Sequence, residues 1–153
     1  MMMTLPLLFA SLVILAGPDR SMATGAAASI IGVLDSSFDA GVGCSFRTMV
    51  KPGQLVWTDM DARMQDGPWA HIDGRPQKLE VLGKLEWPDK KGRSVRFSFR
   101  AEKARVYLDV QLTRGCEDLD NPKQCAGVAY AGTMSAISNG VRQTIKIDGG
   151  CGD

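Results

Sequence analysis

The sequence predicts an all-β fold: a single antiparallel β-barrel or sandwich of about eight strands, arranged mainly in sequential hairpins. After residue 42, apolar and polar residues alternate with a period of two, which is typical of strands that bury one face. Asp-Gly and Asn-Gly pairs separate such segments and favour two-residue hairpin turns. No helical pattern of about ten residues or more follows the N-terminal region. We therefore expect two stacked sheets, or one sheet that closes on itself.

The N-terminal region carries an apolar run, residues 5–16, that is interrupted only by Ser11. The run is shorter than the roughly 20 apolar residues that span a bilayer, but it suits the apolar core of a secretory signal. Ser21-Met22-Ala23 has the small-x-small pattern of a cleavage site, although no Lys or Arg precedes the run. The alternatives are an uncleaved apolar tail or a true start at Met22.

These features predict three segments and a location. The expected segments are a signal peptide over residues 1–23, an irregular N-terminal segment over residues 24–41, and a β-domain over residues 42–153. A signal peptide predicts a periplasmic or secreted protein, and no apolar stretch after it is long enough for a membrane span. The net charge of +1 and a pI near 7.6 argue against nucleic acid as a partner.

The chain has four cysteines and one histidine. No Cys-x-x-Cys pair occurs, so the usual zinc spacings are absent and we expect no metal. An even number of cysteines in an exported chain favours two disulfides. Three pairings are possible, and we expect Cys44–Cys151, which ties the first strand to the last, and Cys116–Cys125, which staples a loop between two strands. Calcium binding in that loop by Glu117, Asp118, Asp120 and Asn121 is the alternative.

The first clear hairpin turns at Asp73-Gly74, which pairs Ile72 with Arg75 and Ala70 with Gln77. One face then carries apolar residues, namely Ala70, Ile72, Leu79, Val81, Leu85 and Trp87. The opposite face is mostly charged and holds Trp69, His71, Lys78, Glu80, Lys84 and Glu86. The charges therefore fall on one side of the predicted hairpin.

Two further hairpins follow along the chain. In the second, Val95, Phe97 and Phe99 oppose Val110, Leu108 and Val106, and Arg96 opposes Asp109 on the polar face. The third turns at Asn139-Gly140 and places Tyr130, Met134, Ala136, Val141, Ile145 and Ile147 on one face. Its other, polar face carries Thr133, Ser135, Arg142, Thr144 and Lys146. A weaker hairpin joins residues 44–50 to residues 55–60 through Pro52-Gly53.

The candidate binding surface comes from the polar faces of these hairpins. Arg96, Arg100 and Arg105 share a face with Tyr107, and this face could contact an acidic protein or another anionic envelope component, such as a glycan or a lipid head group. Trp69 and His71, on the first hairpin, are the second candidate, because an outward tryptophan is a common binding anchor. The competing interpretation for the arginines is that they form an ordinary solvated sheet face. For Trp69, it is that N-terminal residues cover the ring or that the ring packs on the Lys78 stem.

Catalytic signals are few. The single histidine, His71, lies on a polar strand face, and no Gly-x-Ser-x-Gly, phosphate-binding or dinucleotide-binding sequence occurs, so we expect no cofactor. Asp59 and Asp61 stand two positions apart, as do Asp118 and Asp120, so either pair could share a strand face as acid and base. We assign no catalytic residue.

The general build resembles small cysteine-stapled barrels of bacterial envelopes, such as lysozyme inhibitors of the C-type class. The Ser-Gly-x-x-Tyr type loop of those inhibitors is absent here, and residues 138–143 are typical of a hairpin turn, so the likeness is of architecture alone. We expect an exported, disulfide-stapled, non-enzymatic β-domain that binds an envelope or extracellular component. The alternatives are an inhibitor of a secreted hydrolase, a small hydrolase that uses a carboxylate pair, and a structural subunit of an envelope assembly.

Overall fold

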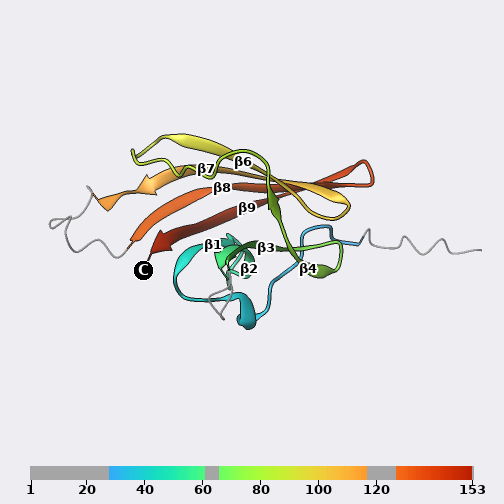
Figure 1. Ribbon diagram of the computed structural model, residues 1–153. Helices are drawn as coiled ribbons and strands as arrows, with labels where there is room; N and C mark the ends of the chain where they lie inside the picture. Colours follow the sequence, from blue (N-terminus) through green and yellow to red (C-terminus); the bar gives the residue numbers. More distant parts are fainter. Residues whose placement is uncertain (1–27, 61–65, 117–126, 153) are drawn as a thin grey trace, which may run out of the picture.

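The computed structural model describes residues 28–60, 66–116 and 127–152. These residues form one nine-stranded antiparallel sheet that rolls into a nearly closed barrel (Figure 1). The predicted all-β class is confirmed, with a barrel-like sheet and nine strands in place of about eight. The predicted signal segment, residues 1–23, lies outside the described residues.

The strand order around the barrel is β4-β3-β2-β1-β9-β8-β7-β6-β5, so most neighbours in space are neighbours in sequence. One 3-10 turn, η1, precedes the sheet. The elements are η1 Ser36–Phe38, β1 Gly43–Thr48, β2 Leu55–Met60, β3 Asp66–Ile72, β4 Arg75–Lys78, β5 Glu80–Val81, β6 Ser94–Arg100, β7 Ala104–Arg114, β8 Gly127–Ser138 and β9 Val141–Gly152. Strand β9 returns to pair with β1, and this contact joins the two halves of the sheet. Within the described ranges, no helix has the length and apolarity needed to cross a bilayer.

The hairpin registers agree with the sequence predictions. Ile72 pairs with Arg75, Phe97 with Leu108 and Met134 with Ile145. At the two tightest turns, φ is 50° at Asp73 and 49° at Asn139, and the glycine after each is also positive. Two successive positive φ values define the type I′ turn, which matches the twist of the flanking strands. These turns lie at one end of the barrel, hereafter the turn end.

The barrel closes through one extended segment that changes partners. The sequence predicts that residues 75–87 continue the first hairpin, but in the structure β4 pairs with β3 whereas β5 pairs with β6. Leu79 lies between them and donates its N–H to the Pro68 carbonyl at 2.7 Å. Leu82 then donates to the Ser98 carbonyl on β6 at 2.8 Å. The segment therefore bridges the two edges of the sheet, and we call this junction the seam.

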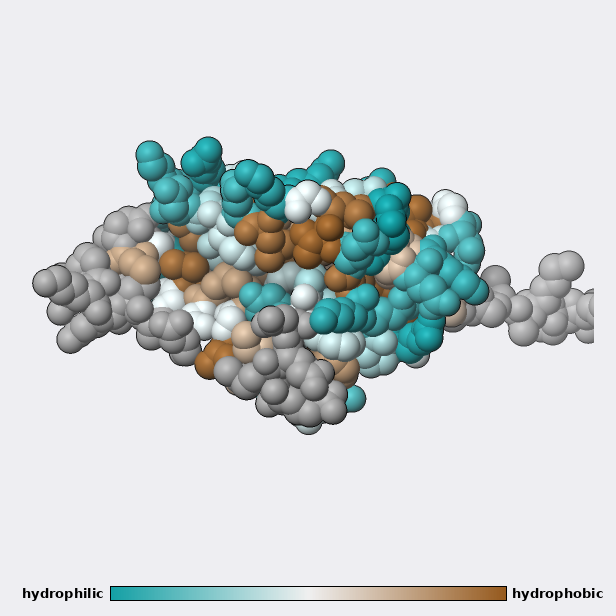
Figure 2. Space-filling view, viewed as in Figure 1, coloured by the Kyte–Doolittle hydropathy of each residue, from teal (hydrophilic) through white to brown (hydrophobic). Residues whose placement is uncertain are grey.

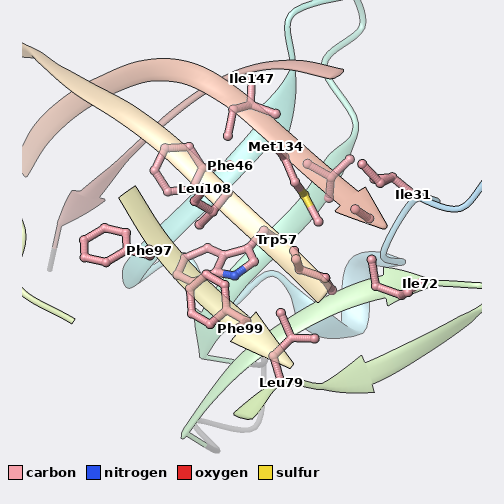
Figure 3. Close-up of a cluster of buried hydrophobic side chains, with 14 of the residues drawn as sticks. Ile31, Phe46, Trp57, Ile72, Leu79, Phe97, Phe99, Leu108, Met134 and Ile147 are labelled. Atoms are coloured by element: carbon pink, nitrogen blue, oxygen red, sulfur yellow. The ribbon is translucent and has the colours of Figure 1, made fainter. Parts of the chain in front are cut away.

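Aromatic side chains fill the interior. Trp57 is fully buried near the centre of the cluster, with Phe46, Phe97 and Phe99 around it (Figure 3). Trp87 enters from the β5–β6 connection, which is not a strand. Its ring centroid lies 4.6 Å from that of Phe97, and it also contacts Trp57, Phe46 and Tyr130. The connection thus closes the barrel beside the seam with a large apolar side chain.

One glycine makes room for these rings. Gly149 of β9 lies between Phe46 of β1 and Tyr130 of β8 in the same cross-strand row. A Cβ atom on Gly149 would lie 2.0 Å from the Ser45 carbonyl oxygen and 2.9 Å from the Phe46 ring. Only glycine therefore permits this close approach of β9 to β1.

A disulfide and the N-terminal segment fasten the two ends of the barrel. The predicted Cys44–Cys151 bridge is present and joins β1 to β9 at the end opposite the turns, hereafter the disulfide end. At the turn end, Ile31 forms a bridge with Ile72, and the Leu34 N–H donates to the Leu55 carbonyl at 2.8 Å. Residues 30–34 thus lie between the diverging ends of β2 and β3, and Ile30, Ile31 and Leu34 are buried.

Candidate functional site: the basic face

The outer sides of β6, β7, β8 and β9 present three parallel rows of side chains that run across the strands. The first row, nearest the turn end, contains Arg100, Arg105, Ile137 and Arg142. The second contains Ser98, Tyr107, Ser135 and Thr144. The third contains Arg96, Asp109, Thr133 and Lys146. We call these three rows the basic face, because they carry five cations and one carboxylate.

The cations of the basic face differ in their partners. Arg96 Nε lies 2.6 Å from Asp109 Oδ1, as the predicted register requires, and this hydrogen bond raises the pKa of the Arg96 guanidinium. Arg100 contacts Glu80 of β5 at 3.1 Å. Among the described residues, Arg105, Arg142 and Lys146 have no ion-pair partner, and all three are exposed. Three cations are therefore available to a ligand.

Arg100 and Arg105 are direct cross-strand neighbours. Like charges in this position destabilise a sheet by several tenths of a kcal/mol. On its other side, Arg100 pairs with Glu80 of β5 and forms an ion pair with it, whereas Arg105 lies between Arg100 and Ile137. Arg105 therefore has no acid opposite it on either neighbouring strand, in contrast to Arg96 and Arg100.

Two shallow hollows lie on this side of the barrel. One, of about 590 Å³, is lined by residues of β6, β7 and β8 that include Arg96, Asp109 and Thr133. The other, of about 400 Å³, lies toward the turn end and is lined in part by Arg100, Arg105 and Ile137. Both are open rather than enclosed, and such surfaces suit macromolecules better than buried small molecules.

The structure separates the residues that the sequence suggested as candidates. Arg96, Arg100, Arg105 and Tyr107 share one face as predicted, whereas β3, with Trp69 and His71, lies on the other side of the strand order. Figure 2 shows hydrophilic side chains along the upper edge of the view, over β6 and β7, and apolar ones in the middle of the view, between β6 and the lower strands.

Trp69 and His71 are both covered. The Phe38 ring centroid lies 5.5 Å from that of Trp69, and Lys78 Nζ lies 5.9 Å from the Trp69 centroid. Gly32 lies against the His71 ring so closely that a Cβ atom there would be 2.0 Å from Nδ1. The described part of the N-terminal segment therefore occupies the surface that a partner of Trp69 would need.

The other predicted sites are only partly within the described residues. Asp59 Oδ1 accepts the Cys44 N–H at 2.7 Å, which gives this carboxylate a structural role beside β1, and Asp61 lies outside the described residues. Asp118, Asp120 and the other proposed calcium ligands of the loop also lie outside them. Cys116 is disulfide-bonded, and its expected partner, Cys125, is likewise outside. Among the described residues, no three His, Cys, Asp or Glu side chains gather as a metal centre would require.

Sequence reasoning did not include Arg142, Lys146 and the hydroxyls of β8 and β9 in the candidate surface. It placed them correctly on the polar face of the third hairpin. The missing information was the register between β7 and β8, in which Tyr107 pairs with Ser135. The loop between these strands is long, so no turn type sets that register.

Comparison with known proteins adds no assignment. No family model, no curated protein and no solved structure matches the chain. The class that fold and site define is therefore a disulfide-bonded, barrel-like β-domain with a basic outer face.

Proposed function

We propose that the protein is an exported, non-enzymatic binding domain that contacts an anionic component of the cell envelope or the extracellular space through the basic face. The observation that carries this proposal is a group of three exposed cations, Arg105, Arg142 and Lys146, around a row of hydroxyls; none of the three has an ion-pair partner within the described part of the chain. The Cys44–Cys151 bridge supports export, because disulfides persist mainly in oxidising compartments.

The filled interior supports a surface role. Buried apolar side chains from seven of the nine strands fill the barrel centre, and Val81 of β5 packs against them (Figure 3). A carrier of small apolar ligands would instead keep an enclosed cavity. Contact through the outer face is thus the mode that this architecture favours.

The test is binding of the oxidised protein to two immobilised polyanions, alginate and poly-L-glutamate, with neutral dextran as the blank. Arg105→Glu/Arg142→Glu should weaken binding to both polyanions at least about tenfold, since close charge contacts contribute over 1.4 kcal/mol together. Binding by the wild type should fall as ionic strength rises.

The matched control is Lys51→Glu/Lys90→Glu, which makes the same change in net charge at exposed lysines away from the basic face. It should bind nearly as the wild type does. Equal losses for both double variants would show that net charge alone matters and would remove the basic face as the contact surface. Absence of wild-type binding to either polyanion would reject the proposed function.

A further inference from the structure

The second row of the basic face has an unusual composition, because all four of its residues end in a hydroxyl. Hydroxyl groups both donate and accept hydrogen bonds, whereas guanidinium and ammonium groups only donate. Ser135 is buried, and its Oγ lies 2.8 Å from Thr144 Oγ1. Ser98 and Tyr107 are partly exposed and Thr144 is exposed, so three hydroxyls of this row reach the surface.

The basic face lacks the apolar anchors of a protein interface. Interfaces between proteins have cores enriched in aromatic residues and methionine, and a few buried anchors dominate their affinity. In the three rows, only Ile137 and Tyr107 have large apolar parts. The hollows on either side of Tyr107 are shallow, so they offer no deep pocket for a side chain of a partner protein.

Cations stand on both sides of the hydroxyl row. Arg142 and Lys146 flank Thr144 on β9 and are about 13 Å apart along the strand, and Arg105 is about 10 Å from Arg142 across two strands. A polymer with anionic groups at intervals and hydroxyls between them matches this pattern. The planar guanidinium of an arginine also suits a carboxylate, because it can donate two parallel hydrogen bonds.

We propose that the anionic component is a linear acidic polysaccharide, whose hydroxyls contact the second row while its acidic groups contact the cations on either side. This inference rests on the proposed function and names the ligand class of the same surface. A run of glutamates has carboxylates for the cations but carries no hydroxyls that could both donate to the second row and accept from it. Removal of the hydroxyls at constant charge therefore distinguishes the two ligands.

The decisive variant is Ser98→Ala/Thr144→Val, tested with Tyr107→Phe on the same alginate and poly-L-glutamate surfaces. Each change removes a hydroxyl and preserves net charge and most of the side-chain volume. We expect the double variant to bind alginate about tenfold more weakly, as two lost hydrogen bonds would give, and poly-L-glutamate unchanged. Tyr107→Phe, which keeps the ring and is the less disruptive change, should show a smaller loss of the same selectivity.

The control Ser36→Ala/Thr113→Val removes two exposed hydroxyls outside the basic face and should leave both affinities unchanged. Circular dichroism and the unfolding midpoint verify that each variant folds. Unchanged alginate binding by both hydroxyl variants, or equal losses for the two polymers, would overturn the polysaccharide inference. In either case, a continued effect of Arg105→Glu/Arg142→Glu would leave the proposed function standing with an acidic protein as the partner.

Discussion

Gly149 allows β9 to approach β1 more closely than any other residue would. Its missing Cβ leaves room for the Ser45 carbonyl and the Phe46 ring, so Gly149→Ala would force β9 away from β1. We expect this variant to lower the free energy of unfolding by about 2–3 kcal/mol, the usual cost of overpacking. The free energies of unfolding of wild type and variant are measured by urea unfolding followed by circular dichroism.

The control for this prediction is Gly92→Ala. Gly92 has a φ of +80° and no atom within 4 Å of the position that a Cβ would occupy, so only backbone strain of about 1–2 kcal/mol applies. If Gly149→Ala costs less than Gly92→Ala, close packing between β9 and β1 is not the reason for the glycine.

Burial of the Tyr130 side chain should make the stability of the fold depend on pH in the alkaline range. Burial raises the pKa of the Tyr130 phenol, whose ordinary value is about 10. The unfolded phenol therefore ionises first as the pH rises, and this favours the unfolded state, so stability is lost above about pH 10. We expect Tyr130→Phe to lack this loss.

The measurement is the free energy of unfolding of wild type and Tyr130→Phe from neutral pH to about pH 11. The difference between the two proteins should change above pH 10 in favour of the variant. Tyr107→Phe serves as the comparison at the other tyrosine of the chain. A difference that stays constant across this range would contradict a buried, hard-to-ionise Tyr130.

Among the elements, hairpins with two-residue turns were the most predictable. Asp73-Gly74 and Asn139-Gly140 set their registers locally, and alternation then predicted the opposite faces of Met134 and Ile145 on one side and of Ser135 and Thr144 on the other. The partner switch at Leu79 was not predictable, because a strand has the same period of two whichever neighbour it pairs with. The sequence therefore placed Leu79 and Val81 inside correctly while extending their hairpin wrongly.

The bridge between β1 and β9 is an element-scale constraint with a measurable effect. Cys44 and Cys151 are 107 residues apart, so the bridge closes a long loop in the unfolded chain. On the loop-entropy model, Cys44→Ala/Cys151→Ala should lower the free energy of unfolding by about 4–5 kcal/mol. Guanidinium unfolding of both proteins provides the comparison, and a loss below about 1 kcal/mol would contradict this role.

The β5–β6 connection stabilises the barrel through Trp87. Its ring contacts four other aromatic rings, although the residue lies outside any strand. Trp87→Ala should cost about 3 kcal/mol or more, as large-to-small changes in a core do. Trp69→Ala, on the outer face of β3, should lower the free energy of unfolding by less. If urea unfolding shows a larger loss for Trp69→Ala than for Trp87→Ala, the connection does not stabilise the barrel through Trp87.

At the scale of the whole molecule, the barrel is not equally stable around its circumference. Strands β7, β8 and β9 pair over long stretches, whereas β5 has two residues and the seam depends on a few hydrogen bonds. We expect native-state hydrogen exchange to be slowest for amides of β7 and β8 and fastest, among the strands, at β4 and β5. Equal protection in all nine strands would mean that the barrel opens only as one unit.

The candidate site also depends on how the hairpins align within the whole barrel. The shared face of Arg96, Arg105 and Tyr107 follows from one hairpin and was predictable. The contribution of Arg142 and Lys146 depends on how the second and third hairpins align, which is set by core packing along β7 and β8 and by no local turn. The cover over Trp69 likewise depends on Phe38, from a segment without periodicity.

The position of the Cys44–Cys151 bridge has a mechanical consequence. Cys151 is one residue from the end of β9, which lies between β1 and β8. A pulling force on the C-terminus therefore passes through a covalent bond into β1 before it can peel β9 away residue by residue. Under reducing conditions the same force would unzip β9 from its end, so single-molecule extension of the protein should require much less force after reduction.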